Sequence, residues 1–124
     1  MPRTAVPYTP LVPNGSLADP AGTTIDATLV TNGVVINGAD PEHTVIRVTN
    51  SSGAARIVTV KAGTGTPALS AGQGDLAVSI ATTATAWFGP IASGRFQQTG
   101  TKLHVDFAAG TTGSITVFKL PRAI

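Results

Sequence analysis

Cysteine is absent from this chain of 124 residues. The absence excludes a disulfide framework and every zinc or redox site that depends on a thiolate. Charge is also scarce, because eight Lys and Arg stand against six Asp and Glu and the net charge is only +2. These basic residues are scattered along the chain, whereas nucleic-acid binders gather them on one face. We therefore expect no nucleic-acid partner.

Long hydrophobic runs are missing as well. No window approaches the roughly 20 apolar residues that a membrane-spanning helix needs. Residues 1–7 lack the apolar core of a secretory signal. These two absences predict no membrane partner and synthesis in the cytoplasm. Because 42% of the residues are hydrophobic and only 11% are charged, the composition favours a protein that works while packed against its neighbours.

The spacing of apolar residues expected for a helix is also missing, and short β-branched runs separated by Gly, Asn, Pro and Ser take its place. In the run from Lys102 to Phe107, every second residue is apolar, as in a half-buried strand. This pattern predicts one all-β domain over residues 24–124, an antiparallel, jelly-roll-like sandwich. Its expected strands are residues 24–30, 34–36, 44–50, 56–62, 76–80, 83–88, 94–97, 102–107 and 114–120.

Proline is concentrated at the start of the chain, with five of the nine prolines in the first twenty residues. Proline fixes φ and has no backbone donor, so a helix or a central strand is excluded there. We therefore predict an extended N-terminal arm over residues 1–23. Apolar residues in this arm would anchor it to another surface, and a disordered tail is the alternative.

The sequence contains few residues in patterns typical of catalysis. His104 and Asp106 share one strand face, which resembles half of a nucleophile-activating triad or part of a metal site. No Gly-x-Ser-x-Gly elbow accompanies them, no second histidine is near, and His43 follows a turn. The Gly-rich stretch 63–74 lacks the Gly-Lys-Ser/Thr ending of a phosphate loop, and it is expected to be a long loop between strands. We predict no enzyme activity, no catalytic residue, no metal and no cofactor.

Aromatic residues are sparse, and two of the six are adjacent. Neighbours in a strand point to opposite faces, so Trp87 and Phe88 cannot both lie in the core. Phe88 shares its face with Ala84 and Ala86. The pattern therefore predicts that Phe88 is buried and that Trp87 lies at an interface.

Several phrases in the C-terminal two thirds carry a family resemblance. They are the strand 44–50 followed by 55–62, then Asp75-Leu76-Ala77-Val78, Trp87-Phe88-Gly89-Pro90, the segment 96–107 and the closing strand 115–120. In strand order and in these phrases, residues 31–121 resemble the small capsid decoration, or cement, proteins of tailed phages.

The resemblance implies a sandwich that sits on the outer surface of the virion and clamps neighbouring copies of the phage major capsid protein. It also implies a homotrimer at three-fold positions or a homodimer at two-fold positions. The expected contact residues are Tyr8, Leu11 and Val12 in the arm, and Trp87 and Arg95 near the Gly-Pro turn. Two alternatives stay open: a carbohydrate- or receptor-binding module of a tail or fibre, and an enzyme that uses His104 and Asp106.

Overall fold

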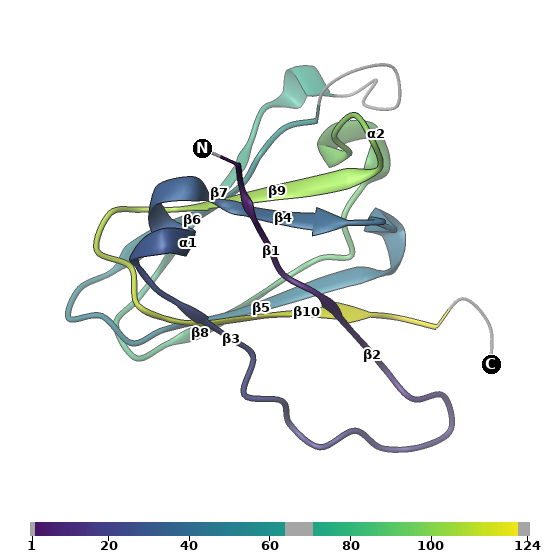
Figure 1. Ribbon diagram of the computed structural model, residues 1–124, viewed down its shortest axis with the longest axis horizontal. Coiled ribbons are helices and arrows are strands. Elements are labelled where there is room, and N and C mark those ends of the chain that lie inside the picture. The colour runs from purple at the N-terminus through teal and green to yellow at the C-terminus, as the bar shows by residue number, and fades with distance from the viewer. Residues whose placement is uncertain (1, 64–70, 122–124) are drawn as a thin grey trace.

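Two five-stranded sheets pack face to face in the computed structural model, which describes residues 2–63 and 71–121 (Figure 1). The first sheet has the order β1 (Thr4–Ala5), β4 (Val34–Asn37), β9 (Lys102–Phe107), β6 (Arg56–Val60) and β7 (Leu76–Ile80). The second has the order β2 (Tyr8–Pro10), β10 (Gly113–Lys119), β5 (Thr44–Asn50) and β8 (Thr85–Phe88), and β3 (Thr23–Ile25) also pairs with β10. The chain is mostly β.

The core lies between the two sheets, and alternation along the strands builds it. In β9, Leu103 and Val105 are fully buried and Phe107 nearly so, while the residues between them face outward. The same period of two places apolar side chains from both sheets in one layer, which is the main favourable term for the fold. The fully buried residues of this layer include Val34, Ile36, Ile46, Val48, Leu103, Val105, Ile115 and Val117.

Most of the expected strands are present. Residues 44–50, 76–80 and 102–107 match β5, β7 and β9, and the expected strands at 34–36, 56–62, 83–88 and 114–120 differ from β4, β6, β8 and β10 only at their ends. The expected Gly-rich loop falls largely on residues 64–70, which lie outside the described residues. The part that is described contains the 3-10 helix η2 (Ala71–Gln73).

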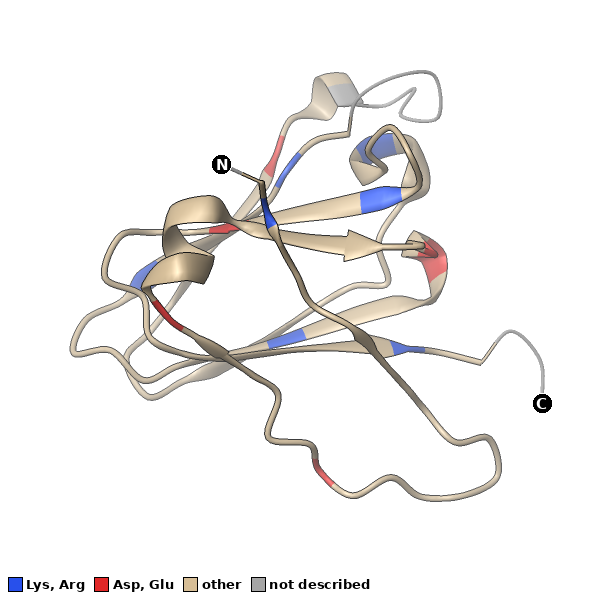
Figure 2. Ribbon diagram, in the orientation of Figure 1, with Lys and Arg blue, Asp and Glu red and all other residues tan. Residues whose placement is uncertain are grey.

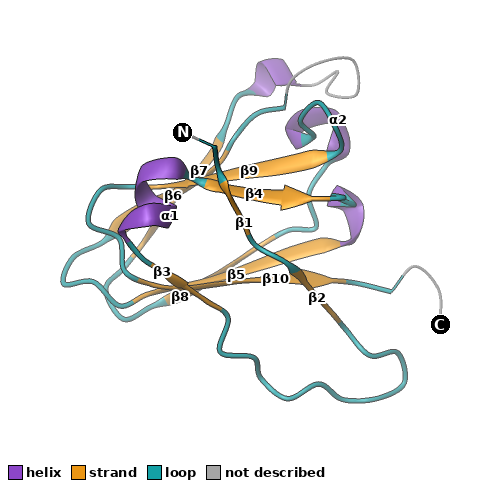
Figure 3. Cartoon of the chain, viewed as in Figure 1, coloured by secondary structure: helices purple, strands orange, loops and turns teal. Residues whose placement is uncertain are grey.

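The prediction of strands at 24–30 and 94–97, and of no helix, was wrong. After β3 the helix α1 (Ala27–Asn32) begins, because the Asp26 carboxylate accepts the Leu29 N–H at 3.0 Å and caps the helix. Residues Ser93–Phe96 form the short helix α2, and a second 3-10 helix, η1, spans Pro41–His43 (Figure 3). Each of these helices is too short to show the apolar spacing of a longer helix. None of the helices in the described residues has the length and apolar character of a membrane span.

The prediction of an N-terminal arm was also wrong. β1 pairs in parallel with β4, and β2 pairs in parallel with β10, so the start of the chain belongs to both sheets. Val6, between these strands, is 3% exposed and donates its N–H to Val35. Pro10 is compatible with β2 because this strand lies at a sheet edge. The sheets are therefore mixed rather than antiparallel, and the segment between β2 and β3 runs outside them as a loop.

Candidate functional site

The outer face of the second sheet carries a pair of stacked aromatic rings, of which Trp87 is exposed and Phe118 is buried. Register places Phe118 of β10 beside Val45 of β5, and Arg47 of β5 beside Trp87 of β8. Trp87 is 61% exposed, and its ring stacks on Phe118 with centroids 5.7 Å apart. Phe88, one residue further, is 3% exposed, so the predicted burial of Phe88 is confirmed, and Trp87 points to the opposite, outer face.

An apolar groove runs beside this stack. It is open to solvent, has a volume of about 220 Å³, and is lined by Leu11, Val45, Trp87, Phe118 and Leu120. All five side chains are apolar, which is unusual for a solvated surface where isolated apolar residues are the norm. We call this feature the Trp87 groove.

Arg47 holds the cluster and the neighbouring loop in place. Its guanidinium lies 5.8 Å from the Trp87 ring centroid and 5.5 Å from that of Phe118, within the range of a cation–π contact. The same group donates hydrogen bonds to the Asp19 carboxylate and to the Pro20 carbonyl. One side chain therefore fixes both the aromatic stack and the loop between β2 and β3, which makes the groove a pre-formed surface.

The structure brings two of the five sequence-predicted contact residues together, because Leu11 and Trp87 both line the Trp87 groove. Val12 follows Leu11 and is 49% exposed. Tyr8 lies elsewhere: its ring packs against the core, and its hydroxyl lies 2.7 Å from Thr44 Oγ1. Arg95 belongs to α2, stacks 4.6 Å from the Phe96 ring and donates from Nε to the Gly74 carbonyl.

Sequence reasoning missed Val45, Arg47, Phe118 and Leu120. The signal for Phe118 is in the sequence, since it follows Val117 in a strand whose inward residues are Ile115 and Val117. A large aromatic residue on the outward parity of a strand indicates a second apolar face. The other three residues are found only once the register between β10, β5 and β8 is known.

His104 and Asp106 share the outer face of β9, as expected, but Asp106 is paired with a different residue. Its Oδ1 lies 2.5 Å from an Arg3 guanidinium nitrogen. His43, in η1, has its Nδ1 3.3 Å from Oδ1 of Asp40, the residue that precedes this 3-10 helix. Within residues 2–63 and 71–121, no group of three His, Asp or Glu side chains is placed to hold a metal ion.

Stability should fall at acidic pH because of His104. Burial lowers the pKa of His104 below its ordinary value of 6.5, with Arg3 and Lys102 adding to the effect and Asp106 opposing it. The unfolded chain therefore binds a proton more readily, and the free energy of unfolding decreases as pH falls below 6.5. In urea unfolding at pH 7.5 and pH 5.0, we expect the His104→Gln variant to lose less stability than the wild type. An equal loss in both proteins would contradict this role.

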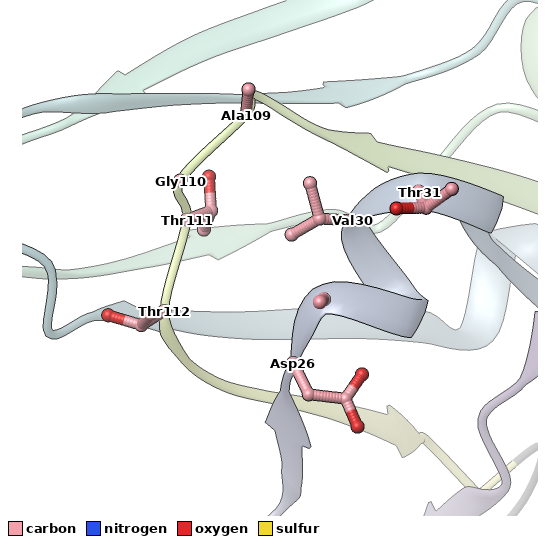
Figure 4. A pocket seen from close by; sticks show the side chains of 8 residues that line it. Asp26, Val30, Thr31, Ala109, Gly110, Thr111 and Thr112 are labelled. Carbon is pink, nitrogen blue, oxygen red and sulfur yellow. The ribbon is translucent and has the colours of Figure 1, made fainter.

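A second pocket lies between α1 and the turn that joins β9 to β10 (Figure 4). It has a volume of about 250 Å³, and its polar side chains include Asp26, Thr111 and Thr112. Asp26 caps α1, and Thr111 Oγ1 donates to the Ala108 carbonyl at 2.6 Å. Thr112 Oγ1 lies 3.1 Å from Ser51 Oγ. These groups are used in local structure, so the Trp87 groove is the stronger candidate.

The candidate site is thus a rigid apolar surface that suits contact with another macromolecule and offers no nucleophile or general base of its own. Exposed aromatic residues backed by a rigid scaffold are typical of the residues that dominate protein–protein binding energy. Comparisons with family models, with curated proteins and with solved structures found no match to this chain.

Proposed function

We propose that this protein is a structural component of a phage virion, which binds the outer surface of the capsid and cements neighbouring major capsid subunits. The observation that carries the proposal is the Trp87 groove, an apolar surface held in place before any partner arrives. The scarcity of charge and the resemblance of residues 31–121 to capsid decoration proteins support the same function. The protein acts mechanically in this role and needs no cofactor.

The groove suits a long-lived contact for physical reasons. The stack on Phe118 and the Arg47 contact already restrict Trp87, so little side-chain entropy is lost on binding. An aromatic side chain of this kind contributes more than 2 kcal/mol in many interfaces when a partner covers it. An apolar capsid side chain that fills the groove beside Leu11 and Val45 would exclude the remaining water.

The path of the chain supports the jelly-roll-like relationship that belongs to this proposal. The connections β4–β5, β5–β6, β7–β8, β8–β9 and β9–β10 all cross from one sheet to the other. Frequent crossing between two facing sheets is typical of Greek-key and jelly-roll sandwiches. The parallel pairs made by β1 and β2 are additions to that plan at the sheet edges.

The Trp87→Ala variant tests the proposal. We expect it to bind capsids that lack this protein at least about 30-fold more weakly than the wild type, because the largest exposed side chain of the groove is removed. Binding is measured by co-sedimentation as copies per particle over a range of protein concentrations. Ile57→Ala is the matched control, since Ile57 is 50% exposed but lies on β6 of the other sheet.

The result is decisive in either direction. Saturation of the wild type at a copy number that matches a capsid symmetry axis, with binding lost only in Trp87→Ala, supports cementing through the groove. Equal capsid binding by Trp87→Ala and the wild type removes the groove from the mechanism. No capsid binding by the wild type rejects the proposed function.

A carbohydrate- or receptor-binding module of a phage tail or fibre is the second candidate, and the exposed Trp87 ring favours it. Sugars stack on exposed aromatic side chains, and such modules usually present more than one ring. Here Phe118 is only 5% exposed, which leaves Trp87 as the one aromatic platform of the groove. Glycan binding that is lost in Trp87→Ala, without capsid binding, would favour this candidate.

A further inference from the structure

One side of the sandwich ends in two open strand edges. β7 is the last strand of the first sheet and β8 the last of the second, and residues 81–84 join them. The opposite side is occupied by β1, β2 and β3. The two sides of the sandwich are therefore different. The N-terminal strands cover one side, and the other side leaves backbone N–H and C=O groups available for hydrogen bonds to another strand.

The available groups on β8 follow from its pairing with β5. The Asn50 N–H donates to the Ala84 carbonyl at 2.9 Å, so residues 84, 86 and 88 direct their backbone groups toward β5. In an antiparallel ladder the alternate residues, Thr85 and Trp87, must direct their N–H and C=O groups away from β5. Within the described part of the chain, no hydrogen bond to these backbone groups is found. Such a row of groups is a template for another strand.

The side formed by β7 and β8 also lacks the usual protection of an open edge. Monomeric proteins guard edge strands with charged residues, proline or bulges. Residues 76–88 contain no Asp, Glu, Lys, Arg, His or Pro. Both strands are tan in Figure 2, where Lys, Arg, Asp and Glu are coloured blue or red. Four apolar residues that pack against the core are only partly buried here, namely Leu76, Val78, Ala84 and Ala86. The edge is uncharged and its underlying core is incompletely covered.

We propose that a second copy of this chain pairs with β8, antiparallel across a two-fold axis at Ala86. In this register Thr85 lies opposite Trp87 of the other copy. All of the outward N–H and C=O groups of both residues are then hydrogen-bonded, which no shifted register achieves. The second sheets of the two copies become one continuous sheet, with both Trp87 grooves on the same face.

A second copy of the chain fits this edge because the paired strands then both lack charged residues. The same uncharged strand approaches from both sides, so no charge is buried without a partner and no like charges are opposed. Ala86 at the axis is small, and its pair would be of the non-hydrogen-bonded kind, with Cα atoms about 4.5 Å apart. A C2 interface of this kind is the commonest route to a closed oligomer. The pairing goes beyond capsid binding, and it is independent of it.

Sedimentation analysis of the purified protein tests the pairing directly. We expect a reversible dimer, and we expect Thr85→Pro to raise the dimer dissociation constant at least about 100-fold. The Thr85 N–H points away from β5, so proline removes a donor of the proposed interface without removing a bond of the chain's own ladder. Thr85→Val loses the same hydroxyl contact to Thr49 but keeps the N–H, and it should remain dimeric. A wild type that stays monomeric at all concentrations overturns the proposal.

A crosslinking experiment fixes the position of the axis. The chain has no cysteine, so the Ala86→Cys variant carries a single thiol. A Cα separation of about 4.5 Å across the axis is within the disulfide range, and mild oxidation should give a covalent dimer. Ser79→Cys on β7 is the matched control and should stay largely uncrosslinked. A dimer that crosslinks through Ser79→Cys, and not through Ala86→Cys, would overturn pairing at β8.

Discussion

Deletion of residues 2–10 is expected to lower the free energy of unfolding by about 5 kcal/mol. Val6 is 3% exposed in the core, and burying a side chain of this size contributes about 2 kcal/mol. The deletion also removes the bonds from the Thr4 and Val6 N–H groups to Gly33 and Val35, and those of the Tyr8 hydroxyl with Thr44 and Asp40. Small domains have only about 5–15 kcal/mol in total, so the truncated protein should be close to unfolded at room temperature.

Urea unfolding monitored by circular dichroism measures this loss. The control replaces residues 12–18 with Gly and Ser at constant length, because these residues are exposed and form the loop outside the sheets. That variant should stay within about 1 kcal/mol of the wild type. If the deletion leaves the unfolding midpoint unchanged, the first residues are a removable arm after all, and the parallel pairs of β1 and β2 contribute nothing.

Substitution of Gly113 by alanine is expected to cost at least about 3 kcal/mol of stability. Gly113 begins β10 with φ of 132°, a conformation that residues with a side chain rarely adopt. A Cβ atom there would lie 1.9 Å from the Thr49 carbonyl oxygen and 2.9 Å from the Thr49 carbonyl carbon. Because both atoms belong to the backbone of β5, relief requires a shift of the strand and of the core behind it.

Gly53→Ala provides the comparison for this substitution. A Cβ atom at Gly53 meets no atom within 4 Å, and no positive φ is found at that residue. Its stability should stay within about 0.5 kcal/mol of the wild type. Thermal unfolding of the two variants side by side gives the answer. If the Gly113→Ala protein were as stable as Gly53→Ala, the backbone where β5 and β10 meet could shift to accept a Cβ atom without loss of stability.

The sequence predicts the central strands well because they bury one face each. Alternation in residues 102–107 and in 76–80 needs only local information, and both strands begin and end where expected. The same parity argument places Phe88 inside and Trp87 outside. Helix α1 was missed because a single side chain decides it: Asp26 follows β3 and caps a helix of only six residues, which is too short for a periodic signal.

The N-terminal strands were missed for a different reason. Pro7 and Pro10 indicate an extended segment that cannot lie in the middle of a sheet, and this is correct. Whether such a segment pairs at an edge depends on partners far away in the sequence, since β2 pairs with residues Val117, Phe118 and Lys119. The Trp87 groove has the same origin. Leu11 was expected to make contacts, but its position beside Trp87 results from the pairing of four strands.

The pairing of β2 with β10 has a consequence for the order of synthesis. Tyr8 leaves the ribosome more than a hundred residues before its partner Val117, and no local structure replaces that partner in the interval. Long-range parallel pairs of this kind form late, because the loop between them must close first. β2 therefore lacks its partner strand until β10 is made, whereas the partner of β1, the strand β4, is made early.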